Sequence, residues 1–256
     1  MKQIKRYILI SIVLFSFKNQ ALSQIVAKLD TITETSTEPY NQVCFIETYR
    51  VRKFSKNGTF KSTGFFIAPN VILTAGHNLY SNRLTKVTNI KIIPGRYKEN
   101  SAFDIIELKG ELTCQNSIIV HPSFKWNKVN YDFGIIIIPD SLILKTAKWP
   151  KSTSFKLDSG VELKIGDTLN VSGFPANNGY DGSLMTYESQ ICYNVFENKI
   201  SHRFKTETGN SGSPIWIIKN EESFIVGVHT YANAGTLIDK KYIELIQNWI
   251  EQKTIR

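Results

Sequence analysis

The sequence predicts an all-β protein that ends in one helix. From Val43 onward, short segments rich in β-branched and aromatic residues alternate with turn-forming residues, which is typical of an all-β fold. A different pattern begins at Asp239, where apolar residues recur at helical spacing up to Lys253. The 256 residues are 42% hydrophobic and 21% charged, which suits a soluble globular protein with one large β domain or two small barrels.

Residues 1–23 are interpreted as a secretory signal peptide. A basic start precedes the apolar segment Tyr7–Phe17, and the small-x-small sequence Ala21–Ser23 offers a cleavage site before Gln24. The apolar segment holds 11 residues, well short of the ~20 that span a bilayer. We therefore expect a secreted protein, extracellular or periplasmic, without stable membrane association after cleavage.

The leader also carries much of the positive charge. The formal net charge is +9, and the leader holds four basic residues and no acidic one, so cleavage leaves about +5. The remaining Lys and Arg residues are scattered along the chain. We therefore expect a solvated surface and no binding of nucleic acid.

Residues 24–40 are polar and rich in Thr and Glu, so we expect a flexible arm or a short propeptide there. A first β unit is expected over residues 41–140. Within it, Val43–Val51 and Thr59–Ile67 flank the turn signal Asn57-Gly58, which predicts a hairpin. The other strands expected in this unit are Ile90–Ile93, Phe103–Leu108 and Phe133–Ile138.

Residues 141–159 are interpreted as a connection, because Lys, Ser and Thr surround Trp149 and Pro150. A second β unit is expected over residues 160–256, and it includes the helix, for which Asp239 is a possible N-terminal cap. The strands expected in the second unit are Thr168–Val171, Leu184–Phe196, Pro214–Ile218, Phe224–His229 and Gly235–Ile238.

Ser211 is the candidate nucleophile. It lies among small residues in the sequence GNSGSP (Gly209–Pro214), directly before the apolar segment Ile215–Ile218. A nucleophilic serine needs a hydroxyl clear of bulky neighbours and backbone N–H groups that are free to hold an oxyanion. A Ser/Gly turn that leads into a strand is the structural alternative.

His77 and Asp132 offer the other two groups of a serine-hydrolase site. His77 ends the sequence TAGH directly after Val71–Leu73, and Asp132 comes shortly before Ile135–Ile138. A histidine can accept the serine proton, and an aspartate can fix the imidazole tautomer and stabilise the imidazolium. Each residue also has a structural interpretation, as a polar residue at a strand end or a turn former. The order His, Asp, Ser is that of chymotrypsin and differs from the orders in α/β-hydrolases and subtilisins, which favours catalysis.

The sequences TAGH and GNSGSP, together with Ile119–Pro122 running on to YDFG, resemble landmarks of the chymotrypsin-like (trypsin-like) serine peptidases. The similarity extends from about Val43 to Gln252 and is closest to bacterial glutamyl endopeptidases, where Asn precedes the serine. The resemblance implies two six-stranded antiparallel β-barrels, with the active site in the cleft between them and a C-terminal helix packed on the second barrel. It places His77 and Asp132 on the first barrel and Ser211 on the second.

The resemblance also implies a secreted serine endopeptidase that acts on protein or peptide substrates, as a monomer and without a cofactor. Ser211 would attack the peptide carbonyl while His77 takes its proton and Asp132 orients His77. The backbone N–H groups of Gly209 and Ser211 would form the oxyanion hole, where a glycine lets the substrate approach closely. The four histidines are far apart in the sequence and no HExxH pair occurs, so we expect no metal site.

Three positions suggest a preference for glutamate before the scissile bond, and a fourth, Thr230, adjoins them in the predicted substrate-binding region. The glutamyl endopeptidases use a histidine on the strand after the nucleophile and a hydroxyl residue five positions before it, which here are His229 and Thr206. Lys205 stands where trypsin-like enzymes place the charge at the pocket base, and Thr230 where the family often supports the buried aspartate. Such donors and charge offset the cost of desolvating a carboxylate. A core role for His229, an ordinary strand role for Thr206 and a solvent-facing Lys205 are the alternative.

The three cysteines and the alternative functions lead to two further expectations. Three cysteines allow at most one disulfide, for which we expect Cys44 with Cys114, and their spacing resembles no metal or redox motif. A catalytically silent secreted binding protein on the protease fold and a serine peptidase of other specificity both stay open. The intact His, Asp and Ser positions favour an enzyme, and their order argues against an esterase.

Overall fold

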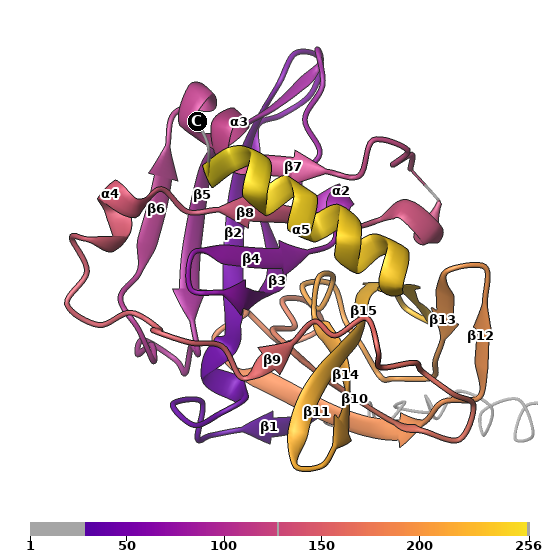
Figure 1. The fold of residues 1–256 in the computed structure, drawn as a ribbon. Coiled ribbons are helices and arrows are strands. Elements are labelled where there is room, and N and C mark those ends of the chain that lie inside the picture. The colour runs from indigo at the N-terminus through magenta and orange to yellow at the C-terminus, as the bar shows by residue number, and fades with distance from the viewer. Residues whose placement is uncertain (1–28, 127, 255–256) are drawn as a thin grey trace, which may run out of the picture.

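The computed structural model describes residues 29–126 and 128–254 and confirms the all-β, chymotrypsin-like fold (Figure 1). Two curled sheets lie one above the other, and a long helix at the C-terminal end crosses the upper one. The predicted signal peptide lies outside the described residues. Among the residues that are described, no helix has both the length and the apolar character needed to cross a membrane.

The first sheet contains seven strands in the order β6-β5-β2-β3-β4-β8-β7, and every pairing in it is antiparallel. The predicted hairpin is confirmed, since its two strands pair from Val43 with Phe65 to Arg50 with Gly58. The strands are β2 (Val43–Arg52), β3 (Gly58–Ala68), β4 (Val71–Thr74), β5 (Thr85–Pro94), β6 (Ile106–Lys109), β7 (Ile118–Val120) and β8 (Gly134–Ile137).

The second sheet contains nine strands and is antiparallel except where β9 pairs with β15. With seven and nine strands, the two curled sheets differ in strand number from the expected six-stranded antiparallel barrels. The expected strand Leu184–Phe196 is divided, because the buried Cys192 lies in a break between β11 and β12. The strands are β1 (Asp30–Ile32), β9 (Phe155–Lys156), β10 (Thr168–Gly173), β11 (Met185–Ile191), β12 (Asn194–Phe196), β13 (Lys199–Ser201), β14 (Pro214–Lys219), β15 (Glu222–Tyr231) and β16 (Ala234–Leu237).

The described part of residues 24–40, expected as a flexible arm or a short propeptide, packs against the rest of the molecule. β1 pairs with β11, so the chain near its N-terminal end belongs to the second sheet. The buried hydroxyl of Thr35 donates a hydrogen bond of 2.7 Å to the carbonyl of Gly95, which follows β5 of the first sheet. The segment is therefore tied to both halves of the molecule by backbone pairing and by a buried hydrogen bond.

One apolar core joins the two sheets. Phe45 of β2 packs edge-on against Phe174 after β10, with ring centroids 5.8 Å apart. Phe65 of β3 packs likewise on Phe155 of β9 at 5.7 Å. These rings are almost completely buried, and removing such surface from water is the main force that holds packed layers together.

The C-terminal helix α5 (Lys240–Thr254) begins where the sequence predicts, with the Asp239 carboxylate accepting the Tyr242 N–H at 3.0 Å. Its docking differs from the expectation of a helix on the second barrel. The ring of Trp249 packs on Phe133 of the first half at 5.7 Å, and the Lys253 ammonium donates to the Asn116 carbonyl at 2.6 Å. The helix thus fastens the C-terminal end across the first sheet (Figure 1).

The expected disulfide between Cys44 and Cys114 is not present, since both thiols are free and buried. They lie in the apolar cluster of the first sheet, where the Cys114 thiol contacts the Leu108 carbonyl at 3.4 Å. Burial raises the pKa of the Cys114 thiol to about 11. Both residues therefore act as small apolar side chains within the core.

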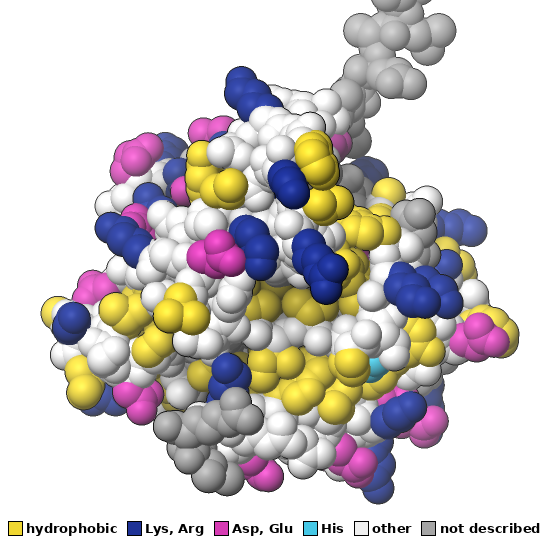
Figure 2. Space-filling model, turned by 90° about the horizontal axis from the view of Figure 1, so that it is seen from above, with side chains coloured by type: hydrophobic (Ala, Val, Ile, Leu, Met, Phe, Trp, Pro, Cys, Tyr) yellow, Lys and Arg dark blue, Asp and Glu magenta, His cyan; other side chains and the backbone are white. Residues whose placement is uncertain are grey.

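Charged side chains are dispersed over one face of the molecule. Figure 2 shows Lys and Arg at separate positions across one face, with Asp and Glu among them. This distribution agrees with the scatter of charges along the sequence.

Candidate active site

His77 and Asp132 come together because the strands that precede and follow them are paired. His77 lies in the short helix α2 (Gly76–Leu79) after β4, and Asp132 follows the 3₁₀ turn η2 (Val129–Tyr131) just before β8. The antiparallel pairing of β4 with β8 sets the end of one strand beside the start of the other.

Asp132 holds His77 through both carboxylate oxygens. Its Oδ2 lies 2.7 Å from the ring Nδ1, and its Oδ1 accepts the backbone N–H of His77 at 2.8 Å. The Asp132 side chain is completely buried, whereas that of His77 is 17% exposed. Since the carboxylate accepts the Nδ1 hydrogen, the Nε2 atom of the ring is left as a proton acceptor.

Arg50 supports the helix that carries His77. Its guanidinium donates to the carbonyls of His77 and Asn78 at 2.8 and 2.7 Å. Burial, together with repulsion by Arg52, lowers the pKa of Arg50 to about 10. The sequence gives no sign of this role, because Arg50 occupies an ordinary strand position on β2.

Ser211 lies in a loop whose shape depends on two glycines. Gly209 and Gly212 have φ of +105° and +93°, which side chains disfavour. A Cβ on Gly209 would lie 2.4 Å from the Phe174 carbonyl oxygen. Within the described part of the chain, the N–H groups of Gly209 and Ser211 donate no hydrogen bond to another protein group. The loop therefore presents two backbone donors beside the serine.

The ring of His77 and the hydroxyl of Ser211 each contact the end of β15, at neighbouring residues. The Tyr231 ring stacks on the His77 ring with centroids 5.7 Å apart. The Ser211 hydroxyl donates a hydrogen bond of 3.1 Å to the carbonyl of Thr230, the residue before Tyr231. Rotation about the Ser211 Cα–Cβ bond redirects this hydroxyl, and catalytic hydrogen bonds commonly tighten only when substrate is bound.

His229 is buried on β15 and contacts a second histidine that sequence reasoning did not single out. Its Nδ1 lies 3.0 Å from Nε2 of His202, and the two side chains are 2% and 0% exposed. Burial lowers the pKa of His202 to about 4, and it lowers that of His229 well below the usual value, with repulsion by His202 and His77 adding to the effect. Both rings are therefore neutral at neutral pH.

The other predicted pocket residues differ in their surroundings. Thr206 is partly exposed, and Lys205 is exposed, with its backbone N–H donating to the Glu188 carboxylate. Thr230 lies on β15, and its hydroxyl donates to the Ala234 carbonyl and not to the Asp132 carboxylate. The Thr236 hydroxyl lies 3.3 Å from the Asp132 backbone carbonyl, and its closer acceptor is the Val129 carbonyl at 2.5 Å.

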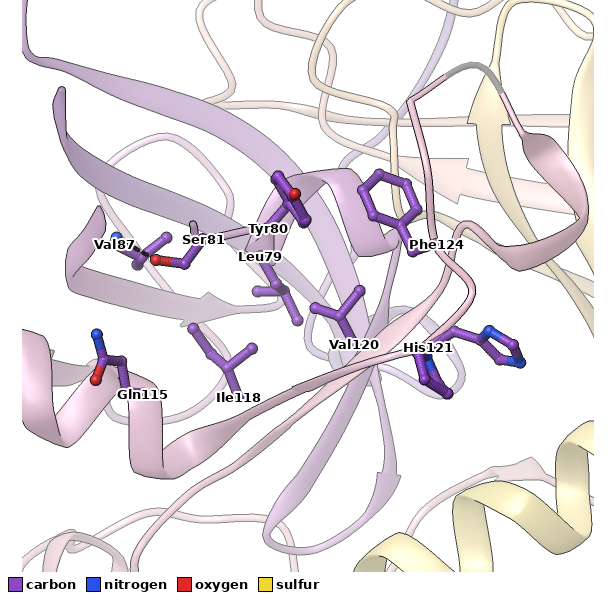
Figure 3. A pocket seen from close by; sticks show the side chains of 10 residues that line it. Leu79, Tyr80, Ser81, Val87, Gln115, Ile118, Val120, His121 and Phe124 are labelled. Carbon is purple, nitrogen blue, oxygen red and sulfur yellow. Dashed lines mark hydrogen bonds between the residues drawn. The ribbon is translucent and has the colours of Figure 1, made fainter. Parts of the chain in front are cut away.

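A separate cavity of about 280 Å³ lies beside the segment that follows α2 (Figure 3). It is partly apolar, with Leu79 and Val120 between Phe124 on one side and Ser81, Val87 and Gln115 on the other. His77, Asp132 and Ser211 are not among the residues that line it.

A family model described as Trypsin matches residues 35–250. An "Extracellular metalloprotease" of Bacillus subtilis (strain 168) is 24% identical over 232 residues, which are 86% of this chain and 67% of that protein. A "Glutamyl endopeptidase" of Bacillus licheniformis is 22% identical over 231 residues, which are 85% of this chain and 66% of that protein. The chain thus spans about two thirds of the length of these curated relatives.

Solved structures share the fold. A structure of Glu endopeptidase in complex with MPD aligns with a TM-score of 0.61 and 22% identity, covering 86% of this chain and 94% of the other. Protease Anisep from Arthrobacter nicotinovorans aligns with a TM-score of 0.60 and 15% identity, covering 84% and 96%. In the ranges that the structure describes, no three His, Cys, Asp or Glu side chains gather as a metal site would require.

Proposed function

The chain belongs to the trypsin family of serine endopeptidases, and on that premise we propose that His77, Asp132 and Ser211 form its catalytic triad. The observation that carries this assignment is the two-point contact between Asp132 and His77. It fixes the ring in the tautomer that leaves Nε2 free to accept a proton. In the reaction the Ser211 hydroxyl turns from the Thr230 carbonyl, to which it donates in the structure, towards Nε2 and supplies that proton.

The reaction is acyl transfer from the peptide amine to water. Ser211 Oγ attacks the carbonyl carbon as its proton passes to His77 Nε2, and the buried Asp132 carboxylate stabilises the imidazolium. The N–H groups of Gly209 and Ser211 hold the oxyanion. His77 then gives its proton to the leaving amine, and water attacks the acyl-enzyme by the same steps in reverse. One oxyanion donor is worth on the order of 10²–10³ in kcat.

We further propose that a glutamate side chain is preferred before the scissile bond, and that His229 and Thr206 bind its carboxylate. Because His229 is neutral and its Nδ1 faces His202, the tautomer that serves binding has Nδ1 as acceptor and Nε2–H as donor. The Thr206 hydroxyl adds a second donor. The exposed Lys205 ammonium attracts the substrate carboxylate through its charge at longer range and does not contact it. The glutamyl endopeptidase among the relatives supports this assignment.

Two measurements test the proposal. Fluorophosphonate labelling of the wild-type protein should be lost in Ser211→Ala, and labelling that persists contradicts the triad. Chromogenic peptides with Glu, Asp, Lys, Leu or Phe before the scissile bond should show a Glu optimum. Equal or better turnover of the Leu or Phe peptides contradicts the specificity.

His229→Ala should lose mainly Glu selectivity, while labelling of Ser211 continues. The comparison is His121→Ala, which removes another buried histidine; its ring packs on Tyr131 and Phe133 on either side of Asp132, so the selectivity and not the rate of this variant is compared. If both variants lose selectivity equally, His229 has no special part in binding the substrate side chain.

Secretion and a monomeric state belong to the same proposal. The leader pattern of residues 1–23 supports secretion, as does the word extracellular in the name of one relative. N-terminal sequencing of protein from the culture medium should begin at or after Gln24. Recovery of the full leader on the secreted protein contradicts the predicted cleavage.

A further inference from the structure

We propose that Thr63 is a positioning residue of the oxyanion hole and acts through the carbonyl group of Gly209. Thr63 lies on β3 of the first sheet, whereas Gly209 belongs to the Ser211 loop that leads into β14 of the second. The inference rests on the proposed function, because it concerns the same site. No motif marks Thr63.

Thr63 is completely buried, and its hydroxyl takes part in two hydrogen bonds. It donates to the Gly209 carbonyl at 2.8 Å and lies 2.9 Å from the backbone nitrogen of Phe174, whose N–H it accepts. A hydroxyl has a single hydrogen, and the Phe174 N–H can only donate, so the hydrogen of Thr63 is committed to Gly209. The Thr63 hydroxyl is therefore held in a single orientation between Gly209 and Phe174.

A second contact fixes the peptide group on the other side of Gly209. The Ala176 N–H donates to the Thr208 carbonyl at 2.6 Å. In a planar trans peptide the C=O and N–H point in opposite directions, so this contact turns the Gly209 N–H away from Ala176. The Thr63 hydroxyl holds the Gly209 carbonyl, so the peptide groups before and after the Gly209 Cα are both fixed by hydrogen bonds. This restraint matters because glycine otherwise rotates freely.

The backbone of Thr63 is itself fixed against the catalytic loop. Its N–H donates to the Ser211 carbonyl at 2.9 Å, and its carbonyl accepts the Thr74 hydroxyl at 2.6 Å. A Cβ on Gly212 would lie only 2.0 Å from the Thr63 carbonyl oxygen, so the two backbones are in close contact. Thr63 thereby sets the position of Gly209 relative to the sheet that carries His77.

Thr63→Val tests this role, because valine keeps the shape of threonine and removes the hydroxyl. We expect kcat for a peptide substrate to fall about 10–100-fold while KM stays within about twofold, since an oxyanion donor acts mainly in the transition state. Thr63→Ser keeps the hydroxyl and should restore most of kcat. A structural role alone would not separate kcat from KM in this way.

Thr48→Val is the matched control. Thr48 lies on the neighbouring strand β2, is completely buried, and its hydroxyl has no hydrogen-bond partner among the described residues. This variant should keep the wild-type kcat. An equal fall in both Val variants overturns the proposal, and so does a folded Thr63→Val protein with unchanged kcat or with a change in KM alone.

If Thr63→Val does not fold, as judged by circular dichroism, Thr63→Cys takes its place. Cysteine has a similar volume and only a weak S–H donor, so kcat should again fall while KM does not. Unchanged kcat in this variant overturns the proposal. Wild-type protein without peptidase activity, or activity that survives Ser211→Ala, overturns the proposed function and this inference with it.

Discussion

Acid should destabilise this protein steeply, because His202 and His229 are buried in their neutral forms. The His202 ring is completely inaccessible, and burial lowers its pKa from 6.5 to about 4. Above pH 6.5 both the folded and the unfolded chain leave this ring neutral. As the pH falls from 6.5 towards 4, the unfolded chain binds a proton that the folded chain does not, so folding loses free energy.

The size of the effect follows from the two pKa values of His202. Lowering the pH from 7 to 5 should cost about 2 kcal/mol of unfolding free energy through His202 alone. For a protein of this size that is a fall in Tm of roughly 4–8 °C. His229 acts in the same direction, since its pKa is also lowered by burial and by repulsion from His202 and His77.

Thermal unfolding at pH 7, 6 and 5 measures this loss, in a window above the titration of most carboxylates. His202→Gln removes the titrating ring, so its loss of stability between pH 7 and 5 should be smaller than that of the wild type. Phe204→Leu is the control, because Phe204 packs on His202 at 4.7 Å and does not titrate. It should lower Tm equally at each pH. Equal acid losses in wild type and His202→Gln would refute the reasoning.

Two further predictions concern the triad and the helix. Asp132→Asn should lower kcat by about 10⁴-fold in peptide hydrolysis, because an amide favours the wrong tautomer of His77. The control Asp140→Asn, at an exposed position, should leave kcat unchanged. Equal rates in Asp132→Asn and wild type would contradict the triad. Trp249→Ala should cost about 3–5 kcal/mol in urea unfolding, because the nearly buried ring packs on Phe133. The exposed Gln247→Ala should change stability by less than about 0.5 kcal/mol, and a similar small effect for Trp249→Ala would show that the helix docks weakly.

The sequence singles out the catalytic candidates because the proposed chemistry limits which residue types can occupy those positions. Gly209 and Gly212 adopt φ values that favour glycine, and they mark the Ser211 loop. The apolar segments before His77 and after Asp132 form paired strands, which is why motifs far apart in the chain meet. Local pattern and tertiary contact agree at these points.

Other features depend on contacts that no local pattern records. Thr63 is one of many threonines on strands, and its hydroxyl gains a role only because the Ser211 loop brings the Gly209 carbonyl within hydrogen-bond distance. The helical spacing of α5 predicts that one face is buried but not which sheet covers it. Cys44 and Cys114 share a core without bonding, which spacing along the chain cannot reveal.

The strand β1 has a consequence for the assembly of the molecule. Its partner β11 comes from the far half of the chain, so Asp30–Ile32 cannot find its place until Met185–Ile191 has been synthesised. Without β1, one side of β11 is an open edge whose backbone groups can pair with a strand of another molecule. These three residues therefore act as a short intramolecular edge strand, which occupies the backbone groups of Met185–Tyr187 that another molecule could otherwise pair with.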